Sequence, residues 1–166
     1  MQRRLTWLVL LSAAIVATAG SAFATPPTGF TSTTLALGQL GAFDVSSFFI
    51  NKNNSLWLSF QKTRGKSDAY VVNNVWAPGG DTGWHTHPSY TLVIVTAGAV
   101  TQYEAHDSGC TPHVYTAGMA FIDEGGSHVH IVRNESSVEA QVIAVRLVPT
   151  GQPGRIDAPD PGNCHF

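Results

Sequence analysis

From residue 68 to residue 149, short runs rich in apolar and β-branched residues are separated by polar, turn-forming residues. Residues 69–77 are rich in Val, Tyr and Trp, residues 90–96 are mostly apolar and β-branched, and residues 138–148 form a long final run. Runs of this kind, bounded by Gly, Pro, Asn or Asp, are typical of β-strands. Beyond Ala24 no segment has convincing helical periodicity. The pattern predicts an all-β fold, a sandwich or a barrel, in a single domain.

Less regular segments lie on either side of this region. Residues 25–34 are rich in Thr, Pro and Gly, so we expect a loose leader there. Short strands are expected at residues 35–45 and 56–60, with the start of a short turn at residues 46–49 and a turn cluster at residues 51–54 between them. The end of the chain contains many Pro and Gly residues without periodicity. The expected organisation is a leader with flanking strands, a barrel and a tail, over residues 25–67, 68–149 and 150–166, respectively.

Residues 1–24 have the pattern of a secretory signal peptide. Arg3 and Arg4 form a positively charged start, Leu5–Val16 is an almost unbroken apolar run, and an Ala-Phe-Ala sequence ends at Ala24. The alternative is a retained membrane anchor, but the apolar run is shorter than the ~20 residues that a spanning helix needs. We therefore expect cleavage after Ala24 and a secreted or periplasmic protein.

The charge balance argues against some classes of partner. Without Arg3 and Arg4, the chain carries 7 basic and 11 acidic side chains, a formal charge of −4. No cluster of Lys and Arg remains that could attract phosphate groups. Binding to nucleic acid, or to an anionic membrane after cleavage of the signal, therefore has no electrostatic support.

The two cysteines, Cys110 and Cys164, lie in loop-like sequences of the exported part. An even number of cysteines in an oxidising compartment favours a disulfide, which would tie the tail to a loop of the barrel. The alternative, a thiolate metal ligand, is disfavoured because neither cysteine has a second ligand at metal-binding spacing beside it.

Three histidines form a candidate metal site. His85 and His87 follow a Gly-rich loop with one residue between them, so on a strand both side chains point to the same face. A third imidazole, His130, lies on a later predicted strand and could complete a facial set around one ion. Taken singly, the first two could be surface imidazoles and His130 a histidine of the core.

The spacing of these residues resembles the first sequence motif of the cupin superfamily. That motif consists of a Gly, five residues, His-x-His, three or four residues, a Glu, six residues and a Gly. Here Gly79, His85, His87 and Gly98 fall at the matching positions. Thr91 stands where the family has its Glu.

The second cupin motif, Pro-x-Gly, two residues, His, three residues and Asn, is matched in part. His130 and Asn134 stand at its His and Asn, whereas Gly125 and Ser127 replace its Pro and Gly. The resemblance extends over about residues 69–149. The whole chain is also similar to a group of small exported bacterial cupins of unassigned activity, which end in a similar Ile-Asp-Ala-Pro…Asn-Cys tail.

The resemblance implies a double-stranded β-helix, also called a jelly-roll barrel, with a divalent transition metal in its mouth. It assigns the ligand role to His85, His87 and His130, and the ion would be Fe, Mn, Zn, Ni or Cu. Thr91 cannot supply the charge of the missing carboxylate. Such a site would keep more positive charge and attract anionic ligands more strongly. Similar barrels often form homodimers.

Without a first-motif carboxylate, proton transfer would fall to His128, Tyr90 or Glu124. His128 would share a strand face with His130, where it is a fourth ligand, a group that supports the ligands, or a histidine that simply lines the pocket. Tyr90 and Thr91 could form hydrogen bonds with a metal-bound water or a substrate, or Tyr90 packs in the core. Glu124 is either a carboxylate near the mouth or an exposed loop side chain.

Three functions are compatible with this sequence. The first is a mononuclear metalloenzyme of dioxygenase or isomerase type that acts on a small organic substrate. The second is a binding module that holds a metal or a small anionic ligand without turnover. The third is a domain in which the metal only stabilises the fold. The sequence favours a metal site but does not separate these functions, because a fold does not determine a chemistry.

Overall fold

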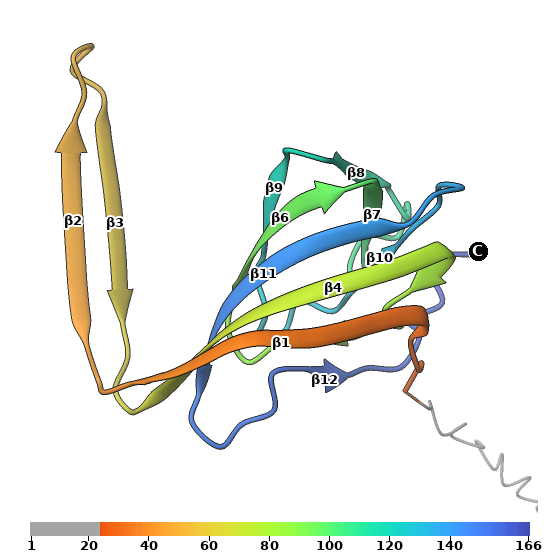
Figure 1. The fold of residues 1–166 in the computed structure, drawn as a ribbon, viewed down its shortest axis with the longest axis horizontal. Helices are drawn as coiled ribbons and strands as arrows, with labels where there is room; N and C mark the ends of the chain where they lie inside the picture. The colour runs from red at the N-terminus through yellow and green to blue at the C-terminus, as the bar shows by residue number, and fades with distance from the viewer. Residues whose placement is uncertain (1–23) are drawn as a thin grey trace, which may run out of the picture.

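The computed structural model describes residues 24–166; nearly all of the predicted signal peptide lies outside the described residues. The regular structure of the described part consists of strands, as Figure 1 shows, and the all-β prediction is confirmed. No helix of residues 24–166 is long and apolar enough to cross a membrane. The strands are β1 (Thr28–Leu40), β2 (Asp44–Ile50), β3 (Leu56–Lys62), β4 (Ser67–Asp81), β5 (His85–Thr86), β6 (Thr91–Ala97), β7 (Ala99–Glu104), β8 (His113–Thr116), β9 (Ala120–Asp123), β10 (His130–Arg133), β11 (Ala140–Pro149) and β12 (Ile156–Asp157).

Ten of these strands form one antiparallel sheet that wraps around a common interior. One half has the order β1-β4-β11-β6-β9 and the other the order β12-β5-β10-β7-β8. The two halves join where Arg133 of β10 pairs with Asp81 of β4. Two antiparallel half-sheets with strands that cross between them are the arrangement of a jelly roll, so the predicted barrel is confirmed.

The core lies between the two halves. Val72, Val95 and Val142 come from the first half, and Val100 and Val132 come from the second. Along β6 the buried and exposed positions alternate strictly up to Thr96, as expected for a strand with one face on the core and the other on solvent. The sequence does not mark this inward face, because the exposed Leu92 and Ile94 are as apolar as the buried Val93 and Val95.

The segment before residue 67 differs from the sequence-based expectation. Residues 28–40, expected to begin as a loose leader, form the long strand β1, which pairs with β4 along almost its whole length. The cluster of Pro and Gly residues ends at Gly29, and the β-branched threonines that follow fit a pleated strand. A bulge between Thr34 and Ala36 accommodates an irregularity in the pairing.

Residues 46–49, expected to begin a turn, belong instead to β2. β2 and β3 form a separate two-stranded hairpin that extends away from the barrel (Figure 1). The turn between them lies at residues 51–54, where the amides of Asn53 and Ser55 donate to Oδ1 of Asn51. The predicted turn cluster at residues 51–54 is therefore correct, and the turn expected to begin at residues 46–49 is not formed.

The tail after residue 149 packs onto the barrel. Its short strand β12 pairs with β5, and the amide of Ala158 donates to the carbonyl oxygen of Trp84. Cys164 is bonded to Cys110, as predicted, and both pack in a second small apolar cluster around Trp84. The tail therefore covers the strand that carries the first two histidines.

Candidate metal centre

A Gly-rich turn delivers the first two histidines to the interior. Gly83 has a φ of +64°, and a Cβ at this position would lie 2.1 Å from the carbonyl oxygen of Thr25. Only glycine fits there, because other residues would meet both the steric clash and the strain of positive φ. The chain then enters β5, so that His85 and His87 point to the same side. His130, the first residue of β10, pairs directly with His85.

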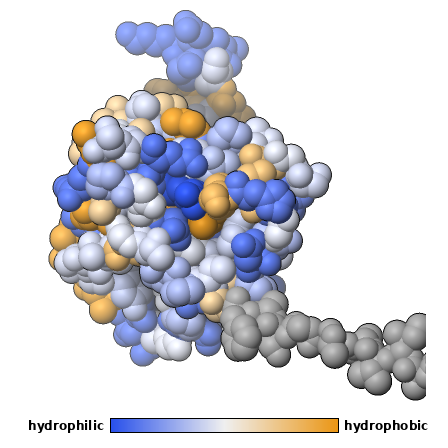
Figure 2. All heavy atoms as spheres, turned by 90° about the vertical axis from the view of Figure 1, so that its right-hand side faces the viewer, coloured by the Kyte–Doolittle hydropathy of each residue, from blue (hydrophilic) through white to orange (hydrophobic). Residues whose placement is uncertain are grey.

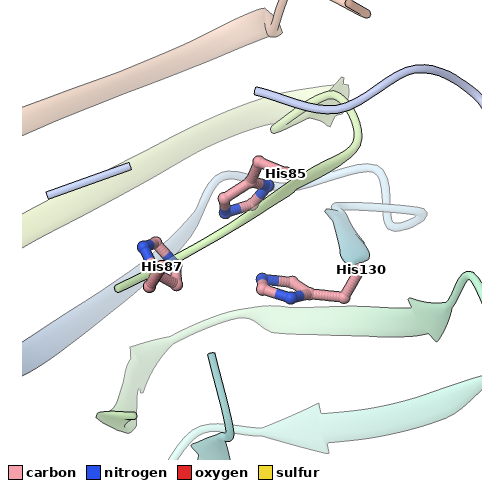
Figure 3. Close-up of side chains that lie close together, drawn as sticks. All are labelled: His85, His87 and His130. Atoms are coloured by element: carbon pink, nitrogen blue, oxygen red, sulfur yellow. The ribbon is translucent and has the colours of Figure 1, made fainter. Parts of the chain in front are cut away.

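The three imidazoles converge on one point (Figure 3). All three residues are buried, with relative exposures between 1% and 6%. One nitrogen of each ring lies within 4.8 Å of the other two. Three atoms at that spacing are about 2.8 Å from their centre, so shifts of roughly 0.7 Å would give the usual metal–nitrogen distance of about 2.1 Å. The structure therefore brings together the three residues that the sequence singled out.

The opposite nitrogen of each ring fixes the orientation of the imidazole. Every Nδ1 atom of the three lies within hydrogen-bonding distance of a backbone carbonyl oxygen. A carbonyl oxygen only accepts, so each Nδ1 carries the proton and each Nε2 of the neutral ring presents a lone pair. This arrangement is typical of metal-binding histidines. The carbonyl groups are those of Gly83, Gly154 and His128, at 3.0, 2.7 and 3.3 Å from the rings of His85, His87 and His130.

A carboxylate that the sequence analysis missed, that of Asp123, lies against two of the three imidazoles. Oδ2 of Asp123 lies 2.9 Å from Nε2 of His87 and 3.0 Å from Nε2 of His130. Two ligand atoms on one ion, each at about 2.1 Å and at right angles, are about 3.0 Å apart. Oδ2 therefore lies at the spacing of a neighbouring ligand from two of the three rings, a spacing that a direct hydrogen bond also has.

The electrostatics of the cluster favour a cation at its centre. Burial by itself raises the pKa of the Asp123 carboxyl, but contacts with His130 and His87, which favour the ionised carboxylate when these rings carry a proton on Nε2, outweigh burial and hold that pKa well below its usual range. Burial, together with the positive charges around it, lowers the pKa of His85. The carboxylate is thus ionised and faces nitrogen lone pairs, a repulsive contact unless a proton or a metal ion lies between them. Nε2 of His130 is fully buried and makes no hydrogen bond of acceptable geometry.

The cluster opens into a cavity of about 320 Å³ inside the barrel. Two arginines, Arg146 and Arg155, lie on its wall, and aromatic and aliphatic side chains form most of the remainder. Arg146 donates to the carbonyl oxygen of Gly154, which also accepts from His87. The arginine therefore stands beside the ligand cluster and gives that side of the cavity a positive charge.

Several buried polar atoms on the cavity wall have no hydrogen-bond partner among the described residues. Trp76 and Thr91 are each only 2% exposed. Because an unpaired buried polar group is costly, such atoms indicate where a bound molecule would make hydrogen bonds. They are Oδ1 of Asn74, Nε1 of Trp76, Oγ1 of Thr91 and Nε of Arg146.

The structure does not bring the three proton-transfer candidates into this cavity. His128 lies outside β10 and does not share a face with His130; its ring pairs with Glu124 at the surface, at 3.0 Å. Only its backbone carbonyl touches the cluster. Tyr90 is 37% exposed and precedes β6. Glu124 is exposed because successive residues of a strand point to opposite faces, and its neighbour Asp123 takes the inward position at the end of β9.

Comparisons with known proteins concern the fold. No protein-family model matches the sequence, and no curated protein does. A conserved protein with a double-stranded β-helix domain from Klebsiella pneumoniae subsp. pneumoniae MGH 78578 is 23% identical; the alignment covers 54% of this chain and 74% of that one, with a TM-score of 0.45. An oxalate oxidase is 18% identical over 88% of this chain and 62% of its own, with a TM-score of 0.49.

A cupin domain from Bordetella pertussis Tohama I is 21% identical, over 64% of this chain and 93% of that one, with a TM-score of 0.41. Similarities as distant as these three concern the fold alone and leave activity and ligands open. The strand order and the meeting of the two histidine motifs, by contrast, are properties of this chain itself. On those properties, the chain has the double-stranded β-helix fold of the cupin superfamily.

Proposed function

We propose that this protein is an exported cupin that holds one divalent transition metal at three histidines and one aspartate and uses it to act on a small organic anion. The observation that carries this proposal is the convergence of three buried imidazoles, two of which, His87 and His130, also contact the carboxylate of Asp123. The reaction would be of dioxygenase or isomerase type, and the protein would work in the periplasm or outside the cell.

The residues present fit such an ion. The ligand set would be three neutral imidazole nitrogens and one carboxylate oxygen, which suits Fe, Mn, Zn, Ni or Cu. The buried, unpaired Nε2 of His130 is the atom that an ion would satisfy. A bound metal would supply a Lewis acid or, for a redox-active ion, a centre for electron transfer.

The charge of the cavity supports an anionic ligand. One carboxylate against a dication leaves a net positive charge, and Arg146 and Arg155 add to it. Asp123 is the only carboxylate that lines the cavity in the described part of the chain. A bound anion would therefore meet attraction from the wall and little repulsion.

The walls restrict the size and the character of the ligand. A cavity of about 320 Å³ is at the low end of the range of about 300–1,000 Å³ that is common for small-molecule sites. Phe30 and Phe121 provide an apolar surface, and Trp76, Thr91 and Arg146 provide unpaired polar atoms. A small carboxylic acid with an apolar body matches this combination.

A non-catalytic role is the second candidate, and one observation favours it. The cavity holds no imidazole or carboxylate outside the ligand cluster, among residues 24–166, that could act as a general base. A module that binds a metal or a small anion without turnover needs no such group. The two functions share the metal centre and differ in the fate of the ligand.

Metal analysis of protein purified without a chelating tag tests the shared part. We expect close to one equivalent of metal, and less than a tenth of an equivalent in the His87→Ala variant. Less than a tenth of an equivalent in the unmodified protein, even after incubation with each of the five ions, would refute the proposal. Oxygen uptake or product formation with small carboxylates then separates the enzyme from the binding module, which would return its ligand unchanged.

A further inference from the structure

The hairpin of β2 and β3 makes no strand pairing with the barrel. It forms a sheet of its own and extends from the barrel as a free arm (Figure 1). The carbonyl oxygen of Phe43 and the amide of Thr63 are hydrogen bonded at its base. An isolated two-stranded hairpin is at best marginally stable in water. A persistent arm therefore needs a surface to pack against.

The side chains of this arm are apolar to an unusual degree. Cross-strand pairing puts Phe48 opposite Leu58 and Ile50 opposite Leu56 on one face, with Phe60 beside them. These five residues are 50–74% exposed. On the opposite face, Phe49 is paired with Trp57, and both are about 60% exposed. Apolar residues on both faces of an exposed hairpin are typical of an interaction surface rather than of a solvated loop.

The tip of the arm is polar. It consists of residues 51–55, Asn-Lys-Asn-Asn-Ser, and Figure 2 shows the end of the hairpin as a hydrophilic group above hydrophobic surface. A hairpin that enters a bilayer tip first would have to carry these amides and the charge of Lys52 into hydrocarbon, at considerable cost. The arm is therefore better suited to lie along a protein surface than to insert into a membrane.

A second unpartnered apolar surface lies on the outside of the barrel. The outward positions of neighbouring strands form a row in which Ile122 pairs with Leu92, Leu92 with Val145, and Val145 with Val71. Leu92, Val145 and Ile122 are 44%, 39% and 60% exposed, and Ile94 adjoins them at 48%. The outer face of an antiparallel sheet is usually polar. This face, β1-β4-β11-β6-β9, is therefore another candidate for an interface.

The dimensions of the two surfaces agree. A strand of seven residues, the length of β2 and of β3, is about 23 Å long at roughly 3.3 Å per residue. Five strands at about 4.8 Å spacing extend over about 19 Å from the first to the last. One arm laid across the strands would cover the width of the half-sheet.

The area is also sufficient. Aromatic side chains carry about 150–250 Å² each, so Phe48 and Phe60, which share one face and are both 74% exposed, leave roughly 300 Å² per arm, to which Ile50, Leu56 and Leu58 of the same face add. Two arms and the surfaces that they cover would bury at least about 1,200 Å², the lower end of the range of about 1,200–2,000 Å² for a stable interface.

We propose that a second copy of this chain is the partner, and that two copies form a closed two-fold dimer in which each arm lies across the outer face of the other copy's β1-β4-β11-β6-β9 half-sheet. A second copy supplies both apolar surfaces at once, the outer face of the half-sheet and the face of the arm that carries Phe48 and Phe60. Exchange of identical arms closes the assembly at two copies and prevents further growth. The interface is separate from the metal centre and does not depend on the proposed chemistry.

Sedimentation velocity of the untagged protein between 10 nM and 10 μM tests the proposal. We expect a dimer that dissociates only toward the low end of this range. The arm variant Phe48→Ser/Phe60→Ser and the sheet variant Leu92→Thr/Ile122→Thr should each raise the dissociation constant at least 100-fold. Val114→Thr, an exposed apolar position on β8, is the matched control and should leave the dimer intact.

A mixing experiment separates arm exchange from other dimers. One chain lacks the arm because residues 44–62 are replaced by a short Gly-Ser turn, and the other carries the sheet variant. Neither should self-associate, but their mixture should form a heterodimer through one intact arm and one intact sheet. Wild-type protein that stays monomeric at 10 μM, a dimer that survives both variants, or binding of the monomer through its arm to phosphatidylglycerol vesicles would each overturn the proposal.

Discussion

Thr91 and Asp123 face each other across the neighbouring strands β6 and β9. Both are buried, and Asp123 extends its carboxylate to His87 and His130 while Oγ1 of Thr91 has no partner among the described residues. The first motif that the sequence resembles has a Glu at the position of Thr91. In this chain the negative charge comes instead from the opposite member of the same cross-strand pair.

Asp123 should therefore be required for tight metal binding. Asp123→Asn keeps the size of the side chain but removes its charge. We expect metal affinity to fall about 10- to 100-fold, which is the usual effect of losing a group that supports a metal ligand. The loss should be larger if the carboxylate binds the ion directly. Competition with a chelator of known affinity measures the change. An unchanged affinity would show that the carboxylate plays no part in the site.

The cross-strand relationship also provides a rescue. In Thr91→Glu/Asp123→Asn the carboxylate moves to the other strand of the pair, at the position that the family motif uses. We expect this double variant to recover most of the lost affinity, whereas Thr91→Gln/Asp123→Asn, its uncharged match, should not. Failure of both variants to bind metal, with normal thermal melting, would mean that only the geometry of β9 can present the charge.

The three histidines could be predicted from the sequence because their spacing is local. His-x-His on a strand fixes two ligands on one face, and the second motif supplies the third. Asp123 could not be found in this way, since its position depends on the register between β6 and β9, and a shift of one residue exchanges the two faces of a strand. The neighbouring Glu124 was considered as a carboxylate near the mouth, although it points to the surface.

Most of the barrel was predictable because its strands are runs of apolar and β-branched residues bounded by turn-forming residues. In the arm, the strand expected at residues 56–60 lies within β3, whereas its partner β2 was not expected. The segment Asp44–Ile50 has apolar residues on both faces and packs against nothing but its partner strand in the described chain, so no alternation marks it as a strand. The polar turn at residues 51–54 was recognised because Asn-rich turns are specified by their own side chains.

Arg146 should govern binding of the anion without holding the metal. Its guanidinium lies on the cavity wall and its Nε atom has no partner among the described residues. We expect Arg146→Gln to weaken the binding of benzoate, a carboxylate with an apolar body, at least 10-fold in calorimetric titration, with metal content unchanged. Arg133→Gln is the matched control, because Arg133 lies over the ring of Phe166 and does not line this cavity. Equal losses in both variants would contradict the assignment.

The disulfide should contribute substantially to stability. Cys110 and Cys164 are 54 residues apart, and closing a loop of that length in the unfolded chain corresponds to about 4 kcal/mol. We expect Cys110→Ser/Cys164→Ser to lower the free energy of unfolding by about 2–4 kcal/mol in urea titrations. Wild-type protein under reducing conditions should behave like the variant. A neutral surface substitution usually changes the free energy of unfolding by no more than about 0.5 kcal/mol. A loss within that range would show that the tail is held in place without the disulfide.

The stability of the loop before Cys110 should depend on pH through Asp107. Hydrogen bonds from Thr111, and from the amide of Gly109, lower the pKa of the Asp107 carboxyl to about 2. In the unfolded chain the Asp carboxyl has a pKa of about 3.9. The ionised side chain therefore stabilises the folded state above that pH, and this stabilisation is lost as the pH falls toward 2. Asp107→Asn cannot titrate, so the difference in free energy of unfolding between wild type and variant should be largest at pH 5 and should shrink between pH 4 and pH 2. Asp160→Asn, at another turn where a carboxylate accepts from a backbone amide, is the control. A difference that stays constant over this range would show that the charge of Asp107 does not stabilise the loop.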